Sequence, residues 1–145
     1  MCKITLPLFI EDIRNGETKR IYQSDEFPDI TKSPLPDYSI VKSGSYATAA
    51  IQYSRGCPYD CEFCDITALF GRRVRTKTPA QIIAELDQLV GIGWDGGVFF
   101  VDDNFIGHKR KLKEELLPAM IKWMKSHNYP FQFITEASIN LSDDE

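Results

Sequence analysis

The sequence has no excess of positive charge and no long apolar run. Its 17 lysines and arginines are outnumbered by 21 aspartates and glutamates, which gives a formal net charge of −4 and a pI of about 5.2. A chain without a basic field has little to hold a nucleic-acid backbone, so no nucleic-acid partner is expected. No apolar stretch approaches the roughly 20 residues needed to cross a bilayer. The apolar residues 6–10 are followed by Glu11 and Asp12 and lack the features of a signal peptide. The sequence therefore predicts a cytoplasmic protein without a membrane span.

Histidine and cysteine are also scarce. The chain has two histidines and four cysteines, and three of the cysteines fall within residues 57–64. In a reducing compartment, clustered cysteines indicate metal ligation or redox chemistry rather than disulfide bonds. Cys2 stands apart from the cluster and is expected to take no part in its chemistry.

Strand and helix patterns alternate from residue 46 onward. Short apolar runs at 47–53, 98–101 and 131–135 predict three strands, and the unbroken run at 98–101 predicts a strand covered on both faces. A proline-rich stretch at 27–38 predicts an extended connector before them.

Two helices are predicted between these strands. Thr78 is a helix cap, with proline directly after it and Gln81 three residues later, and the apolar stripe that follows should stop near Gly91. The second helix is predicted over 109–125, where leucines and methionines recur every four residues. Pro118 lies inside this pattern and should kink or divide the helix.

The alternation predicts an α/β fold with a parallel sheet and right-handed crossovers. A complete (β/α) barrel takes about 250 residues, whereas only three strands and two helices are expected here. Residues 46–145 should therefore form the first part of a TIM-type barrel. Residues 1–45 are expected to be a linker that leads into it, with a weak strand signal at 20–22.

Cys57, Cys61 and Cys64 form a C-x3-C-x2-C motif directly after the first predicted strand. Each iron of a [4Fe-4S] cluster takes one outside ligand, so three thiolates leave the fourth iron open for chemistry. Three other interpretations remain open. A structural zinc site would need a fourth protein ligand, and His108 and His127 lie far along the chain. A redox dithiol would leave one cysteine surplus, and chance clustering would carry no chemistry.

This motif, with the aromatic Phe63 before its last cysteine, resembles the signature of the radical S-adenosylmethionine (radical SAM) superfamily. The resemblance implies that Cys57, Cys61 and Cys64 bind a [4Fe-4S] cluster and that Phe63 contacts the adenine of S-adenosylmethionine. In that family the cofactor chelates the open iron, and its reductive cleavage gives a 5′-deoxyadenosyl radical that abstracts a hydrogen atom. The implied partners are S-adenosylmethionine, an organic substrate and an electron donor, either a reductase or a protein of the flavodoxin or ferredoxin type.

Further segments resemble a narrower group, the radical SAM proteins that carry an N-terminal cobalamin-binding domain and include the hopanoid methylases. These segments are SRGCP at 54–58, CDI at 64–66, FGRR at 70–73, FVDDNF at 100–105 and TEAS at 135–138. The resemblance implies methylation of an organic substrate. The lead-in is too short for a cobalamin-binding domain, so cobalamin is expected of full-length relatives rather than of this chain. The alternative is a catalytically inactive remnant that still binds a cluster.

Polar residues follow two predicted strands at the rim where barrel active sites gather. The family resemblance implies that the loop with Asp102, Asp103 and Asn104 contacts the methionine end of the cofactor, and Asp103 and Asn104 are the candidates for this contact. They are equally the residue types that cap or turn a chain. Glu136 follows the third strand, and it either binds the cofactor ammonium or the substrate, or is a solvated loop residue.

Overall fold

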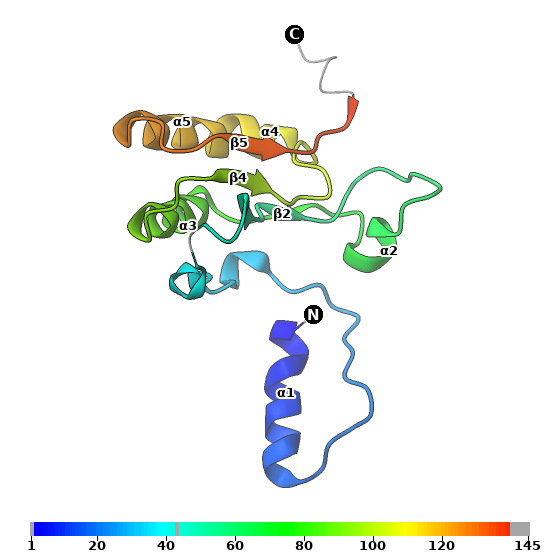
Figure 1. Cartoon of the computed structure of the whole chain (residues 1–145). Helices are drawn as coiled ribbons and strands as arrows, with labels where there is room; N and C mark the ends of the chain where they lie inside the picture. Colours follow the sequence, from blue (N-terminus) through cyan, green and yellow to red (C-terminus); the bar gives the residue numbers. More distant parts are fainter. Residues whose placement is uncertain (1, 43, 140–145) are drawn as a thin grey trace.

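The computed structural model describes residues 2–42 and 44–139, and within them it contains a small parallel sheet with helices beside it (Figure 1). Three strands form this sheet, in the order β1 (Thr48–Ile51), β4 (Gly97–Phe100) and β5 (Phe133–Thr135). Phe100 lies opposite both Ile51 and Thr135, so the three strands end at one rim. The predicted strands and their parallel arrangement are confirmed, although β1 and β5 are shorter than their apolar runs.

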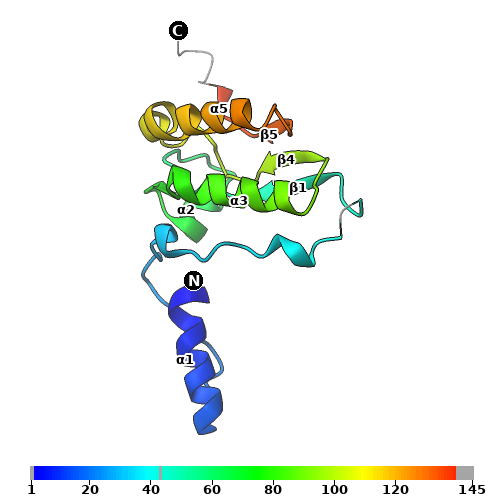
Figure 2. The ribbon, with the colours of Figure 1, turned by 90° about the vertical axis from the view of Figure 1, so that its left-hand side faces the viewer.

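The longer helices that follow β1 in the chain cover one face of the sheet. α3 (Pro79–Gly91) lies beside the segment that runs from α4 (Lys109–Lys111) to α5 (Leu117–Ser126) (Figures 1 and 2). Trp123 on α5 donates a 2.6 Å hydrogen bond to Asp87 on α3 and joins the two helices. A doubly wound sheet carries helices on both faces, whereas a barrel wall carries them on one. The fold class is therefore α/β, part of a TIM-type barrel, as predicted.

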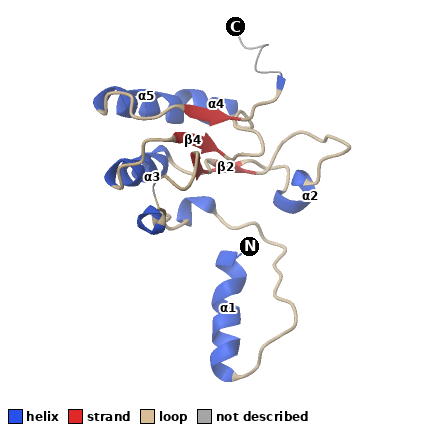
Figure 3. Cartoon of the chain, in the orientation of Figure 1, coloured by secondary structure: helices blue, strands red, loops and turns tan. Residues whose placement is uncertain are grey.

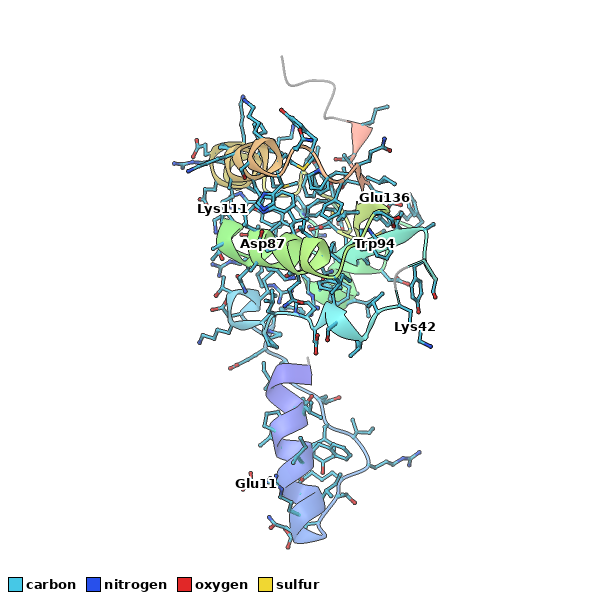
Figure 4. All side chains as sticks on the ribbon, turned by 60° about the vertical axis from the view of Figure 1, so that its left-hand side comes forward. Glu11, Lys42, Asp87, Trp94, Lys111 and Glu136 are labelled. Carbon is cyan, nitrogen blue, oxygen red and sulfur yellow. The ribbon has the colours of Figure 1, made fainter. Side chains whose placement is uncertain are left out.

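The core lies between the sheet and these helices, where side chains fill the space (Figure 4). Ile51 and Val98 are fully buried, Phe100 is 1% exposed, and Leu86 of α3 is fully buried against them. The prediction that residues 98–101 are covered on both faces is wrong in part, because Val101 is 39% exposed. The alternation of buried and half-buried residues along β4 shows the reason, since only one face of the strand meets the helices.

α3 begins where the capping pattern predicts. The Thr78 hydroxyl accepts a hydrogen bond from the Gln81 N–H (3.3 Å), and the Gln81 side-chain oxygen accepts one from the Thr78 N–H (2.9 Å). Together they satisfy two amide donors that the helix itself leaves unpaired. The helix ends at Gly91, but the left-handed glycine that turns the chain is Gly93, with φ of +70°.

The second helix is interrupted, as its proline predicts. A π-helical turn, η3 (Leu112–Leu116), separates α4 from α5, and the Leu117 N–H donates to the Leu112 carbonyl five residues earlier. Leu117 separates Pro118 from this turn, and Pro118 lies in the first turn of α5. Proline has no N–H and its ring crowds the preceding turn of a helix. The π-helical turn is a single-turn bulge, the form in which π-helix mostly occurs inside α-helices.

The lead-in differs from the prediction, because residues 2–15 form a helix that the sequence did not indicate. This helix, α1 (Cys2–Asn15), stands apart from the sheet (Figures 1 and 2). Residues 20–22 form no strand. Instead the Tyr22 ring meets the Phe9 ring edge-on at 5.3 Å, and its hydroxyl donates to Asp12 (2.8 Å), so this segment folds back on α1. No helix in the described part of the chain is long and apolar enough to span a membrane.

The expected connector is not wholly extended. It contains two 3-10 turns, η1 (Ile30–Lys32) and η2 (Tyr38–Ile40), each capped by the carboxylate of a preceding aspartate. The Tyr38 hydroxyl donates to the Ala50 carbonyl of β1 (3.0 Å), and Ile30 is 5% exposed. The segment is therefore fastened to the barrel core. A domain boundary at residue 46 remains a prediction.

Candidate functional site

The three clustered cysteines lie on a loop that leaves the rim of the sheet. After β1 the chain forms β2 (Ser54–Arg55), which pairs antiparallel with β3 (Arg75–Thr76). Residues 56–74 connect these two strands and are called the cysteine loop below. The loop carries the motif as irregular chain, followed by the short helix α2 (Ile66–Phe70) (Figure 3).

The base of the cysteine loop is a close crossing of two backbone segments. Gly56 has φ of +92°, and a Cβ there would lie 2.8 Å from the Gly71 carbonyl oxygen and 2.9 Å from that of Arg73. Only glycine fits both this conformation and this space. The Cys57 N–H then donates to the Gly71 carbonyl (3.3 Å) and closes the loop at its neck.

The three thiols are free, and the loop exposes them to different degrees. Cys61 is exposed, Cys57 and Cys64 are half-buried, and none of them forms a disulfide. Within residues 2–42 and 44–139, no group of three histidine, cysteine or acidic side chains is arranged to hold a metal ion. The donor set nevertheless fits an iron–sulfur cluster, because three thiolates on one irregular loop can be drawn together as the metal binds.

Two aspartates directly after β4 hold the chain that leads into the loop. Asp102, 4% exposed, accepts hydrogen bonds from the Tyr53 N–H (3.0 Å) and from both the N–H and the hydroxyl of Ser54. Asp103 accepts the Gly56 N–H, and its second oxygen, Oδ2, is buried without a hydrogen-bond partner among the described residues. Burial raises the pKa of both carboxyls, and the hydrogen bonds that they accept oppose this rise.

The next two residues reach to the other side of β4. Asn104 is 4% exposed, and its side chain donates to the Ser138 hydroxyl (3.0 Å) and accepts from the Ser138 N–H (3.4 Å). The Phe105 N–H donates to the Glu136 carbonyl (3.0 Å). The amide of the Asn104 side chain therefore already bonds to other protein groups, and its contact with a cofactor remains a prediction.

The other two predicted site residues point outward. The Phe63 side chain is 92% exposed on the cysteine loop. Glu136 is exposed beside the end of β5 (Figure 4). The structure thus places Asp103 against Gly56, the residue before Cys57, and Asn104 against Ser138 on the other side of β4. The roles of Phe63, Asp103, Asn104 and Glu136 in cofactor binding remain predictions.

Both histidines have partners away from the cysteine loop. His108 Nδ1 accepts the Lys111 N–H (3.5 Å) at the start of α4. The His127 ring stacks on Trp123 with centroids 4.4 Å apart, and its Nε2 lies 3.8 Å from Asp87. Both imidazole rings are therefore engaged by helix residues in the described part of the chain.

Sequence reasoning missed the buried contacts made by the basic residues after the loop. The Arg75 guanidinium lies 4.7 Å from the centre of the Phe27 ring and donates to the Pro28 carbonyl (3.1 Å). Lys77 forms an ion pair with Glu85, whose side chain is 2% exposed. A glutamate within the apolar stripe of α3 was the signal that could have revealed this pair.

Known proteins match the part of the chain that contains the sheet and the cysteine loop. The family profile described as Radical SAM superfamily matches residues 51–141. An uncharacterized methyltransferase of Synechocystis sp. is 51% identical over 143 residues, which are 99% of this chain and 26% of that protein. The hopanoid C-2 methylase of Rhodopseudomonas palustris is 43% identical over 131 residues, which are 90% of this chain and 25% of that protein. The chain thus spans about a quarter of the length of these curated relatives.

A solved structure agrees with the fold. The apo form of OxsB, described as a cobalamin-dependent S-adenosylmethionine radical enzyme, matches with a TM-score of 0.63. The match covers 94% of this chain and 22% of OxsB at 17% sequence identity. At that identity the likeness bears on the fold alone.

Proposed function

The chain belongs to the radical SAM superfamily, and we propose that its cysteine loop binds a [4Fe-4S] cluster through Cys57, Cys61 and Cys64. The observation that carries the proposal is the loop itself, in which three free cysteines follow the rim of a parallel sheet. Active sites of barrel enzymes gather at this rim. When bound, the cluster supplies the electron that cleaves S-adenosylmethionine to a 5′-deoxyadenosyl radical.

The residues of the loop divide this work. Cys57 is held at the neck by the Gly71 carbonyl, so its thiol is the fixed ligand. The Cys64 N–H donates to the Cys61 carbonyl (3.0 Å), so these two thiols approach the metal together as one turn. Phe63 lies on that turn, and its exposed ring offers a flat apolar surface for adenine.

Asp103 is the residue we propose for the cofactor ammonium. Its buried Oδ2 has no protein partner among the described residues, and its other contact is the N–H next to Cys57. A buried oxygen of this kind gains most from a charged donor. Glu136 is a second candidate from the end of β5, and Asn104 would act on the cofactor only through the Ser138 segment that it holds.

We further propose methylation of an organic substrate, because two relatives named as a methyltransferase and a methylase align with 90% or more of this chain. The electron donor would be a reductase or a protein of the flavodoxin or ferredoxin type. Cobalamin belongs to this proposal as a cofactor of full-length relatives rather than of this chain.

Anaerobic reconstitution with iron and sulfide tests the cluster. The wild-type chain should become brown and carry about four irons and four sulfides. Each of the single substitutions Cys57→Ser, Cys61→Ser and Cys64→Ser should remove most of this iron. Cys2→Ser is the matched control, because Cys2 lies in α1 outside the loop, and it should leave the iron content unchanged.

Three results would contradict the proposal. One is a wild-type chain without iron and sulfide, a second is a colourless zinc-loaded chain, and a third is iron content that does not depend on the loop cysteines. Assaying 5′-deoxyadenosine under a strong reductant then separates an active site from a remnant. A chain that holds the cluster but forms none of this product would be the inactive alternative.

A further inference from the structure

We propose that Asp102 is a positioning residue for the cysteine loop, because its carboxylate holds the backbone that presents Cys57. This inference rests on the proposed function of the loop as a cluster site. It concerns a residue that the cluster does not touch, since Asp102 is buried under the rim.

The sheet register brings Asp102 to this task. Phe100 lies opposite Ile51 in the β1–β4 pair, so the residues that follow each strand leave the rim at the same level. Asp102 Oδ2 accepts the Tyr53 N–H, and Oδ1 accepts both the N–H and the hydroxyl of Ser54. Both carboxylate oxygens are therefore occupied by the segment that runs from β1 to the loop.

The hydrogen bonds continue from Ser54 to Cys57 without a gap. Arg55 pairs with Arg75 in the β2–β3 ladder, and the Gly56 N–H donates to Asp103. The Cys57 N–H donates to Gly71. Asp102 is the first support in this series, so the chain that carries the first thiol is pinned residue by residue before any metal arrives.

The chemistry requires a carboxylate at residue 102. Three donors converge on its two oxygens, and a carboxylate accepts all of them because it has no donor of its own. An amide at the same place would turn an NH2 group toward an N–H or a hydroxyl and leave at least one buried amide unpaired. An unpaired buried donor carries its full desolvation cost.

Residues 102–105 also support the side of the rim next to β5. Asn104 and Phe105 hold residues 136 and 138 after β5, while Asp102 and Asp103 hold residues 53–56 after β1. Residues 102–105 therefore act as a brace across three strand ends. Loosening the brace at Asp102 should release the cysteine side and leave the β5 side attached.

The test compares Asp102→Asn with Val98→Ala, a substitution in β4 that removes buried apolar volume and leaves every loop hydrogen bond in place. Both reconstituted proteins are treated with an iron chelator, and the rate of iron release is measured. Supporting groups around metal ligands typically change metal affinity by 10- to 100-fold. We expect Asp102→Asn to release iron about tenfold faster or more than wild type, and Val98→Ala to release it at close to the wild-type rate. Equal rates for the two variants would overturn the inference, because a general loss of stability would then explain both.

A second measurement needs no metal. Hydrogen exchange of the Tyr53 and Ser54 amides in the metal-free chain should accelerate in Asp102→Asn and stay protected in Val98→Ala. Unchanged exchange in Asp102→Asn would overturn the inference even if the cluster forms. If Asp102→Asn does not fold, Ser54→Ala takes its place, because it removes the hydroxyl donor to Asp102 and keeps the Asp102 carboxylate. Iron release from Ser54→Ala at the wild-type rate would then overturn the inference. A wild-type chain that takes up no iron overturns the proposed function first, and this inference with it.

Discussion

A buried ion pair connects three parts of the chain. Lys77 Nζ lies 2.5 Å from Glu85 Oε1, and these side chains are 11% and 2% exposed. The Tyr38 hydroxyl lies 3.4 Å from the other Glu85 oxygen, and the Lys77 N–H donates to the Tyr53 carbonyl (2.8 Å). The pair therefore links the lead-in, α3 and the chain after β1.

Replacing Lys77 by methionine keeps the apolar length of the side chain and removes its charge. Glu85 would then be a buried carboxylate whose remaining hydrogen bond, from Tyr38, is long. Removing one partner of a buried pair costs about 3–5 kcal/mol, which is a large share of the roughly 5–15 kcal/mol that keeps a domain folded. With a urea slope of about 2 kcal/mol per molar, a loss of about 4 kcal/mol lowers the unfolding midpoint by about 2 M.

Urea unfolding followed by far-ultraviolet circular dichroism measures this shift. Lys122→Met is the matched control, because Lys122 is exposed on α5, and it should change the free energy of unfolding by less than about 0.5 kcal/mol. The double variant Lys77→Met with Glu85→Met replaces the whole pair by apolar groups and should recover most of the loss. A midpoint for Lys77→Met within about 0.3 M of wild type, or a double variant less stable than Lys77→Met alone, would refute the reasoning.

Three further substitutions test the neck of the cysteine loop and the core. Gly56→Ala should lower the free energy of unfolding by more than about 1 kcal/mol, since its φ is +92° and carbonyl oxygens occupy the space for a Cβ. Gly91→Ala is the control, because nothing lies within 4 Å of its new Cβ, and it should be neutral or stabilising by up to about 1 kcal/mol. A thermal unfolding midpoint lower for Gly91→Ala than for Gly56→Ala would count against this account of the neck. Leu86→Ala should cost about 2–5 kcal/mol in urea because Leu86 is fully buried, and a cost below about 1 kcal/mol would show that α3 does not anchor the core.

The parts of the fold that follow from neighbouring residues could be predicted. The cap at Thr78 and the interruption at Pro118 depend on residues within one or two helical turns, and both lie where the pattern put them. The parallel sheet followed from the alternation of apolar runs. The cysteines follow β1 along the chain as their place in the sequence indicates, but the short strand β2 lies between them and β1.

The parts that depend on distant contacts could not be predicted. α1 has Pro7 inside it, and its fold-back contact comes from Tyr22, ten residues beyond Asp12. The contact between Asp102 and Ser54 spans 48 residues and exists only in one strand register. The sequence marked Asp102 as polar and at a strand end, but it did not reveal which backbone amides the carboxylate would meet.

The π-helical turn η3 changes the direction in which the apolar side chains of its helix face. On an ideal α-helix of about 3.6 residues per turn, side chains four positions apart step about 40° around the axis. Leu112, Leu116 and Met120 keep this spacing, yet they are only 6%, 0% and 6% exposed. A turn with more residues per revolution takes back part of that rotation. The irregularity that accommodates Pro118 therefore also steers the apolar stripe, so that three successive turns face the same sheet.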